Sequence, residues 1–213
     1  MSRNTNKVFW NEFYKAEKAV NKPSNFAFFI LKFLNKYKSR IIDIGCGNGR
    51  DLLFFKRNNL DFLGIDLSRN ATQYIKKKLK NKKDKKKILN SDFVKFDYKN
   101  KIKDNFSIYS RFTWHTISEK SEKVFLRKIS KLKNLDFIFI ETRSDKDDLY
   151  GVGKKIGKNE FVTDHYRRFI NKKDLSNQFN KNFEILYLNE SKGFSKFKKE
   201  DPCLIRMIAK KRR

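Results

Sequence analysis

The sequence predicts an α/β fold in which strands alternate with helices around a parallel sheet. From residue 40 onward, short apolar runs that end in glycine or an acidic residue alternate with amphipathic helical stretches. The chain of 213 residues, with 22 Phe and an apolar fraction of 38%, is long enough to bury one sizeable core. It shows no internal repeat. We therefore expect a single domain over residues 1–213.

Two amphipathic helices are expected in residues 1–38, before the first strand. In VFWNEFYKAEKAV, aromatic residues recur four positions apart, as Trp10 and Tyr14 do, which places them on one helical face. Ser24 is the candidate N-cap of the second helix. The apolar face of that helix consists of Ala27, Ile30, Leu31 and Leu34.

Five parallel strands are expected between residues 40 and 142. The candidates are RIIDIG, DFLGIDLS, KILNSDF, NFSIYSRF and DFIFIETR. The connecting stretches GRDLLFFKRN, ATQYIKKKLKNKK and SEKVFLRKISKL have helical patterns, and Ser68 is placed to cap the second of them. This alternation is typical of βαβ units.

The pattern breaks after the fifth strand. Residues 143–170 form a polar, glycine-bearing insertion that is longer than ordinary connections, and such loops are usually functional or disordered. Its histidine, arginine and aromatic content favours function, so we expect the insertion to cover a substrate. Over residues 171–213, a helix in KKDLSNQFN and two strands, FEILYLNES and CLIRMIAKK, close the chain.

The formal net charge of +28 has two explanations. It is compatible with nucleic acid as a partner. Lys, Asn, Ile and Phe are also abundant together while Pro occurs only twice, a joint bias that an AT-rich genome would impose on any protein. We favour the compositional cause and expect the lysine run at 76–87 to be solvated. Arginine, the rarer basic residue, is then the more informative one.

The chain is expected to be cytoplasmic. Cys46 and Cys203 have no metal-ligand spacing and do not make a disulfide framework, so a reducing compartment fits. The start of the sequence lacks the apolar core of a signal peptide, and no apolar run approaches the roughly 20 residues that span a bilayer. No membrane insertion and no metal are expected.

The run IIDIGCGNGRD is the most specific motif. A strand ending at Ile44 leads into Gly45, Gly47 and Gly49, so the backbone can turn tightly and approach a nucleotide-like cofactor where a helix begins. Arg50 stands where a nicotinamide-dinucleotide fingerprint has its third glycine, and no GK[ST] loop follows. A pyrophosphate cradle is therefore disfavoured.

Three acids follow successive strands of the predicted sheet. Asp43, Asp66 and Asp92 lie at carboxyl ends, where open α/β sheets bind ligands. Asp66 is near the spacing at which an acidic residue meets ribose hydroxyls. Acids suit a cofactor with hydroxyls, an amine and a cation. The alternative is that the glycines only form turns and the acids only cap helices.

IIDIGCGNGRD, GIDLS and SDF resemble the first three motifs of class I S-adenosylmethionine-dependent methyltransferases, over about residues 40–142. The resemblance implies a Rossmann-like, seven-stranded, mostly parallel sheet with an antiparallel last strand and helices on both faces. It implies S-adenosyl-L-methionine as the cofactor. GCGNGRD after an aromatic helix is similar to the tellurite-resistance and thiopurine-type small-molecule group of this family.

The resemblance assigns the cofactor contacts residue by residue. The glycine loop and Asp43 would hold the methionine portion, Asp66 the ribose hydroxyls and Asp92 the adenine amino group. Two aromatic residues of the N-terminal helices would cover the cofactor, although each also suits a core position. The full expected set is Tyr14, Phe26, Asp43, Gly45, Cys46, Gly47, Gly49, Arg50, Asp66, Leu67, Asp92, Phe93 and Ser110.

The end of the fourth strand, IYSRFTWHTI, is where this family presents residues to the methyl acceptor. Members that methylate base amino groups carry an Asp/Asn-Pro-Pro-aromatic motif there, and this chain has none. Arg111 at the sheet edge would be costly unless it pairs with an anion. His115 either orients the acceptor or packs beside Trp114 as a structural residue.

Further arginines point to the same conclusion. Guanidinium groups bind carboxylate or phosphate in a bidentate manner, so converging arginines predict an anionic acceptor. We assign substrate binding to Arg111, Arg143, Tyr166, Arg167 and Arg168. The alternative for the last two is local pairing with Asp147, Asp148 or Asp164.

Carboxylates and phosphates need no general base, whereas a sugar hydroxyl would need one. Arg111, His115 and His165 are the candidate catalytic residues.

The leading hypothesis is a methyltransferase that acts on an anionic small molecule or glycan terminus. SRF with a following histidine, DDLYGVG, HYRRF and ESKGFSKFKKEDP are also similar to methyltransferases associated with surface polysaccharides. An RNA methyltransferase is the alternative suggested by +28 and KKKLKNKKDKKK. A non-enzymatic cofactor-binding or assembly protein is the third. The sequence leaves the acceptor atom and the oligomeric state open.

Overall fold

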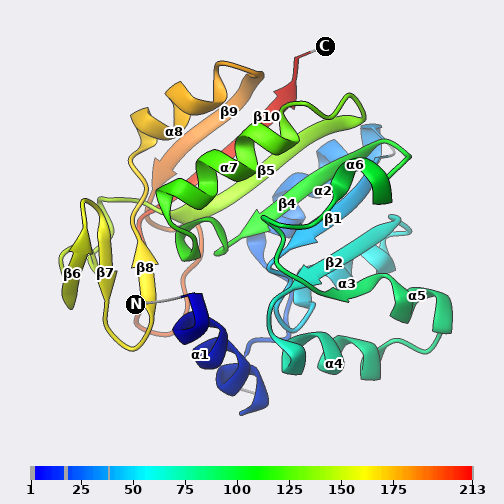
Figure 1. Ribbon diagram of the computed structural model, residues 1–213, viewed down its shortest axis with the longest axis horizontal. Coiled ribbons are helices and arrows are strands. Elements are labelled where there is room, and N and C mark those ends of the chain that lie inside the picture. Colours follow the sequence, from blue (N-terminus) through cyan, green and yellow to red (C-terminus); the bar gives the residue numbers. More distant parts are fainter. Residues whose placement is uncertain (1–2, 17–18, 38, 213) are drawn as a thin grey trace.

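A computed structural model describes residues 3–16, 19–37 and 39–212 of the protein. Its centre is a seven-stranded sheet with the order β3-β2-β1-β4-β5-β10-β9 (Figure 1). The strands are β1 (Arg40–Ile44), β2 (Phe62–Asp66), β3 (Ile88–Asn90), β4 (Phe106–Arg111), β5 (Leu135–Arg143), β9 (Phe183–Ser191) and β10 (Leu204–Lys211). The first five are parallel, and β10 is antiparallel to both of its neighbours, β5 and β9.

Helices cover both faces of this sheet. They are α1 (Arg3–Lys15), α2 (Asn25–Tyr37), α3 (Arg50–Arg57), α4 (Arg69–Lys78), α5 (Lys82–Lys86), α6 (Tyr98–Lys101), α7 (Glu119–Ile129) and α8 (Lys172–Phe179), with a 3-10 turn at Trp114–Thr116. None of them, within the described residues, is long and apolar enough to cross a membrane.

Two hydrophobic cores form because neighbouring strand residues point to opposite faces. Ile42 and Ile108 pack into the core under α6, α7 and α8, whereas Ile41 and Tyr109 pack into the core under α2, α3 and α4. The central strands are therefore apolar on both faces, as buried parallel strands are. The expected Rossmann-like α/β fold, with its antiparallel last strand, is confirmed.

The predicted helix caps are present. The Ser24 hydroxyl accepts a hydrogen bond from the Ala27 N–H at 3.1 Å, and the Ser68 hydroxyl accepts one from the Ala71 N–H at 3.1 Å. The second of these helices is shorter than its sequence pattern predicts. Leu79 is buried in an extended conformation and ends α4, so the following lysines form a separate short helix, α5.

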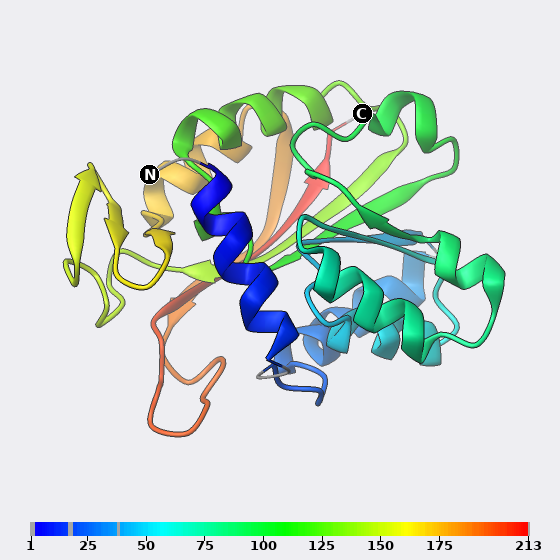
Figure 2. The ribbon, with the colours of Figure 1, turned by 60° about the horizontal axis from the view of Figure 1, so that its bottom comes forward.

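The insertion after β5 contains a small antiparallel sheet, which the sequence pattern did not predict. Its strands are β6 (Lys154–Gly157), β7 (Glu160–Val162) and β8 (Tyr166–Arg168). Helix α1 lies between this sheet and α4 (Figure 2). The Asn6 side chain accepts a hydrogen bond from the Tyr166 N–H at 3.1 Å, and the Asn11 side chain accepts one from the Asn70 N–H at 3.1 Å.

A buried ion pair joins the insertion to α7. Arg168 is 8% exposed and Glu122 is 1% exposed; Arg168 Nη2 donates to the Glu122 carboxylate, and its Nε donates to the Ile117 carbonyl at 2.9 Å. This corrects the expectation that Arg168 binds substrate, because its guanidinium is already committed to α7. The partner, Glu122, lies 46 positions earlier in the chain and is not among the acids that the sequence suggested.

Arg168→Met should lower the free energy of unfolding by about 3 to 5 kcal/mol, because it leaves the Glu122 carboxylate buried and unpaired. The double variant Glu122→Met, Arg168→Met should recover part of that loss, since it removes both charges. Chemical denaturation of the two variants measures the difference. Equal stability of single and double variants would contradict this account of the pair.

Candidate functional site

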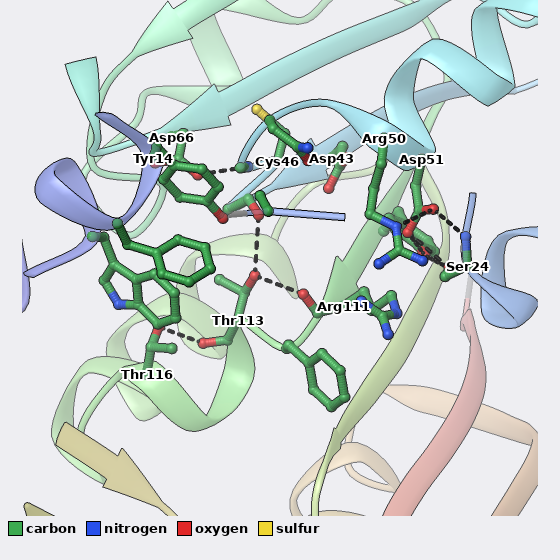
Figure 3. A pocket seen from close by; sticks show the side chains of 18 of the residues that line it. Tyr14, Ser24, Asp43, Cys46, Arg50, Asp51, Asp66, Arg111, Thr113 and Thr116 are labelled. Carbon is green, nitrogen blue, oxygen red and sulfur yellow. Dashed lines mark hydrogen bonds and ion pairs between the residues drawn. The ribbon is translucent and has the colours of Figure 1, made fainter. Parts of the chain in front are cut away.

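A cavity of about 960 Å³ opens at the carboxyl ends of the parallel strands. Its wall is built from the segments that follow β1, β2, β3, β4 and β5, and it is completed by α1 and by residues 195–202 of the β9–β10 connection. Figure 3 shows part of this wall. Open α/β sheets bind ligands at this edge, where the strand order reverses beside β1. Sequence analysis predicted the ligand-binding site at this same edge of the sheet.

The glycine loop forms one wall, and its first two glycine positions leave no room for a side chain. Gly45 and Gly47 have φ values of 67° and 53°, in the left-handed region that favours glycine. A Cβ atom on Gly47 would lie 2.3 Å from the Tyr14 hydroxyl oxygen. Tyr14 of α1 therefore packs directly over the loop, as Figure 3 shows.

Asp66 ties the glycine loop to the end of β2. One carboxylate oxygen accepts a hydrogen bond from the Gly47 N–H at 2.8 Å, and the other accepts one from the Ser68 N–H at 2.7 Å. Burial raises the pKa of Asp66, and these two N–H donors oppose that rise. Each oxygen keeps a lone pair for a further donor, such as a hydroxyl.

Asp43 differs from Asp51 and Asp66, the other buried acids of the cavity, in its lack of hydrogen-bond donors within the part of the chain that the structure describes. It is 3% exposed, and among the described residues no N–H or O–H group donates a hydrogen bond to its carboxylate. Burial raises its pKa well above the usual range, and the charges of Asp51 and Asp66 add to the rise. A cationic or N–H-bearing ligand group would remove this cost.

A third buried acid, Asp51, fixes the start of α3. It accepts hydrogen bonds from the Ser24 N–H at 2.7 Å, the Ser24 hydroxyl at 2.8 Å and the Tyr109 hydroxyl at 2.7 Å. Sequence analysis did not assign a role to Asp51, because its partners come from α2 and β4. These bonds hold three elements together in the cavity wall, which Ser24, Asp51 and Tyr109 all line.

Arg111 leaves the end of β4 and is held by a buried carboxylate. Its Nε donates to Glu141 Oε1 at 2.9 Å, and Nη2 donates to the Ser195 hydroxyl at 2.7 Å. Glu141 is fully buried and also accepts a hydrogen bond from Arg206 Nε at 2.7 Å. One carboxylate thus faces two arginines, and this cluster retains a net positive charge.

Arg50 brings a second guanidinium to the cavity. Its buried Nε has no hydrogen-bond partner among the described residues, and it lies 3.7 Å from the Asp51 carboxylate. Burial lowers the pKa of Arg50, and the positive charge of Arg111 lowers it further. Figure 3 shows both guanidinium groups on the side of the cavity away from Asp66 and Tyr14.

Phe112 occupies the turn after Arg111 in a strained conformation. Its φ is 52°, which is uncommon for a residue with a bulky side chain. The Arg111 guanidinium lies 4.3 Å from the Phe112 ring centroid, and that of Arg143 lies 5.9 Å from it. The ring therefore lies close to two cations, with the shorter cation–π contact to Arg111.

The cavity brings together most of the residues that the sequence singled out. From the cofactor set, Tyr14, Asp43, Gly45, Cys46, Gly47, Arg50, Asp66, Leu67, Asp92 and Phe93 line it. From the acceptor set, Arg111, Arg143 and Tyr166 line it. Arg143 also donates from Nη1 to both carboxylate oxygens of Asp147, at 2.8 and 2.9 Å.

Three residues of the expected cofactor set lie outside the lining. Phe26 is fully buried in the core, with its ring stacked 5.3 Å from Tyr109. Ser110 is also fully buried. Gly49, with φ of 75°, serves as the N-cap position of α3 beside Ile75. Whether a motif position lines the cavity depends on packing, which the motif alone does not specify.

The two histidines and the arginine pair also lie outside this cavity. His165 stacks on Phe9 at 4.3 Å, and burial, together with the charge of Arg167, lowers its pKa to about 4. Burial lowers the pKa of His115 well below the usual range, and Arg143 adds to this effect. Arg167 pairs with Asp164 at 3.1 Å, one of the local pairings that the sequence left open.

Sequence reasoning missed the contribution of the β9–β10 connection. Ser195, Lys196, Phe197, Glu200 and Pro202 line the cavity, as do Thr113 and Thr116 after β4. The connection was assigned to no site because it lies far along the chain from the other motifs. The feature of the sequence that could have indicated this part of the site is the presence of Phe194 and Phe197 in an otherwise polar, glycine-bearing loop.

The sheet order, the glycine turn and the acids at the strand ends define an S-adenosylmethionine-binding fold. Residues 41–134 match the family described as a methyltransferase domain. The fold and this match are those of S-adenosylmethionine-dependent methyltransferase-family enzymes. Within the described residues no group of three or more His, Cys, Asp or Glu side chains is placed to hold a metal ion.

Individual relatives are distant. The chain is 29% identical over 171 residues to the carboxy-S-adenosyl-L-methionine synthase of Nautilia profundicola, covering 74% of this chain and 71% of that protein. A methyltransferase structure from Anabaena variabilis has a TM-score of 0.70 at 18% identity, covering 98% and 94% of the two chains. TehB from Haemophilus influenzae has a TM-score of 0.62 at 15% identity, covering 96% and 67%. These solved structures share the fold.

Asp43→Asn should raise the stability of the cofactor-free protein at pH 7 while weakening S-adenosylmethionine binding. The folded-state pKa of Asp43 is raised, so the buried charge costs stability above that pKa and the cost fades as the pH falls toward the unfolded-state value. Thermal unfolding at several pH values should show the advantage of the variant shrinking at low pH. An advantage that grows as the pH falls would contradict the assignment.

Gly47→Ala should lower S-adenosylmethionine affinity by about tenfold or more, because the new Cβ would collide with Tyr14 and displace the loop. Gly151→Ala is the matched control: its φ is 87°, but a Cβ there meets nothing within 4 Å. Both variants carry backbone strain of roughly 1 to 2 kcal/mol. Calorimetric titration with the cofactor should distinguish them, and equal losses would refute the steric explanation.

Proposed function

We propose that this protein transfers a methyl group from S-adenosylmethionine to an anionic small molecule or glycan terminus, at a carboxylate, a phosphate or a neighbouring hydroxyl. The observation that carries the proposal is the guanidinium of Arg111 in the cavity that Asp43 and Asp66 also line, with Arg50, which the sequence assigned to the cofactor, as a second guanidinium nearby. Asp66 lies at one part of the wall, and the two guanidinium groups lie at another, with Asp51 beside Arg50 (Figure 3). This arrangement suits a cationic cofactor and an anionic acceptor.

The two arginines have donors to spare. A guanidinium carries five N–H donors. Arg50 makes no hydrogen bond among the described residues, and Arg111 uses only Nε and Nη2. Burial lowers the Arg50 pKa, and the repulsion from Arg111 adds to that shift; an anion between the two groups would relieve this repulsion. Charge-assisted, bidentate contacts to carboxylate or phosphate are the strongest bonds such a pair can make.

The residues at the other end of the cavity suit the cofactor. Asp43 lacks a donor and would take the amine of the methionine portion, and Asp66 retains acceptor capacity for ribose hydroxyls. Asp92 and Phe93 line the part of the wall where the adenine would lie. Bound S-adenosylmethionine supplies the methyl group as an electrophile. The contribution of the chain is to orient the acceptor, worth up to about 7 to 11 kcal/mol in well-aligned cases.

An acceptor oxygen that is already ionised fits best. His115 and His165 do not line the cavity, so neither is positioned to deprotonate a hydroxyl. Burial raises the pKa of Tyr166, which does line it, so that phenol stays protonated at neutral pH. A carboxylate or phosphate monoester needs no base at pH 7. We therefore place carboxylate and phosphate ahead of hydroxyl as the acceptor group.

A second candidate function is the synthesis of a carboxylated form of the cofactor. The relative from Nautilia profundicola is named carboxy-S-adenosyl-L-methionine synthase. Arg50 directly follows the glycine loop, and its unpaired Nε supports a carboxylate on the cofactor as well as one on an acceptor. The two functions differ in their chemistry: one yields a methylated acceptor, and the other replaces a proton of the S-methyl group by a carboxyl group released as CO₂ from a small carboxylic acid, which takes up that proton.

A labelling experiment separates these functions. The protein is incubated with S-adenosylmethionine carrying a labelled methyl group and with cell fractions of small acids, glycans and RNA. Label in the acid or glycan fraction supports the first proposal. Conversion of the cofactor to a carboxylated product, seen by mass spectrometry, supports the second. Label confined to RNA, or neither methyl transfer nor cofactor carboxylation despite tight cofactor binding, would overturn both.

Arg111→Lys should lower kcat/KM for the acceptor by about ten- to a hundredfold and leave cofactor affinity nearly unchanged, because lysine cannot form the bidentate contact. Arg206→Lys is the matched control, since Arg206 pairs with the same Glu141 but does not line the cavity. Turnover and cofactor titration are measured for both. If the control loses as much acceptor use as Arg111→Lys, the cavity arginine is not the acceptor clamp.

A further inference from the structure

A second, smaller cavity lies between the insertion and the β9–β10 connection. Its volume is about 220 Å³. The wall is largely apolar and includes Leu149, Val152, Phe161 and Phe169, with Arg167 as its cation and Glu200 at its border. Complete ligand pockets usually measure about 300 to 1,000 Å³, so this space suits part of a molecule.

Arg167 is only partly committed to protein partners. Its Nη1 donates to the Thr163 hydroxyl at 2.5 Å and to the Asp164 carboxylate at 3.1 Å. Among the described residues, Nε and Nη2 of Arg167 have no hydrogen-bond partner, and the side chain is 17% exposed. Burial lowers its pKa, and Asp164 opposes that shift. A half-satisfied guanidinium therefore borders an apolar cavity.

Glu200 connects this cavity to the larger one, because it borders both. Its carboxylate lies 3.5 Å from Arg143 Nη2, and Arg143 lines the larger cavity. The Glu200 side chain is 69% exposed, so the ion pair contributes little and can separate at low cost. The boundary between the two cavities is thus a weak contact on a surface connection.

We propose that the second cavity is an accessory subsite for the distal end of an elongated acceptor. It would take an apolar segment ending in an anionic oxygen, which Arg167 would bind, while the reacting anion lies at Arg50 and Arg111 in the larger cavity. The inference rests on the proposed function and deepens it, because it specifies a dianionic acceptor with an apolar middle. The anionic oxygen would also bond Nε and Nη2 of Arg167, which have no hydrogen-bond partner among the described residues.

The test uses linear dicarboxylates from malonate to azelate, with monocarboxylates of equal carbon number as references. Each is titrated into the protein saturated with S-adenosylhomocysteine, and affinity is measured by ligand-observed NMR. One range of chain lengths should bind about tenfold more tightly than its reference, the gain expected for one added hydrogen bond to a charged group. No gain at any length would overturn the proposal.

Two variants test whether the gain in dicarboxylate affinity comes from the second cavity. Arg167→Gln removes the cation, and Val152→Trp fills the cavity from a residue that is 46% exposed. Each should abolish the gain of the longer dicarboxylates and leave malonate binding unchanged. Lys155→Gln, at an exposed position of β6 that lines neither cavity, is the matched control and should keep the gain. A gain that persists in both cavity variants would overturn the subsite.

The outcomes distinguish this inference from the proposed function. Loss of monocarboxylate binding in Arg111→Lys, without any dicarboxylate gain in the native protein, would leave the acceptor clamp standing and refute the subsite. Monocarboxylate binding that is insensitive to Arg111→Lys would refute the clamp on which the subsite rests. Unchanged S-adenosylhomocysteine affinity in every variant verifies that the fold is intact.

Discussion

The hydrogen bonds of Asp66 are the interaction on which the site depends. Its carboxylate takes the Gly47 N–H on one oxygen and the Ser68 N–H on the other, so the end of β2 holds the turn after β1 and the start of α4. The glycine turn in turn brings Tyr14 of α1 over the loop and places Arg50 at the start of α3. The Gly45 and Cys46 N–H groups also donate to the Ile65 carbonyl of β2, at 2.7 and 3.2 Å, so Asp66 adds a side-chain tie to a turn that the backbone already joins to the neighbouring strand.

Charge separation within one cavity is the second organising feature. Asp43 and Asp66 are buried at the glycine loop, and burial raises the pKa of each. Asp66 accepts two N–H hydrogen bonds, whereas Asp43 accepts none among the described residues, so the charge of Asp43 is costly. The opposite part of the wall carries Arg111, oriented by the buried Glu141. A ligand that is cationic at one end and meets an anion at the other would relieve both costs. This arrangement is the physical basis of the proposed methyl transfer.

Lysine and arginine have different roles in this chain. Lysine is abundant and stands largely at exposed positions, as in α5, where it gives the protein much of its net charge of +28. Arginine is held by specific carboxylates: Arg168 by Glu122, Arg111 by Glu141 and Arg143 by Asp147. The planar guanidinium suits these buried, directional pairs better than an ammonium group does. The structure thus supports the choice of arginine as the informative basic residue.

The sequence by itself determined the sheet, the glycine turn and the positions of Asp43, Asp66 and Asp92, because these follow from local patterns of strand, turn and cap residues. It did not determine which arginines face the cavity. Arg167 and Arg168 are adjacent in the chain, yet one borders a small apolar cavity and the other is buried against Glu122. Likewise Ser195 reaches Arg111 across 84 positions. Such choices depend on contacts between distant segments, which only the packed tertiary structure decides.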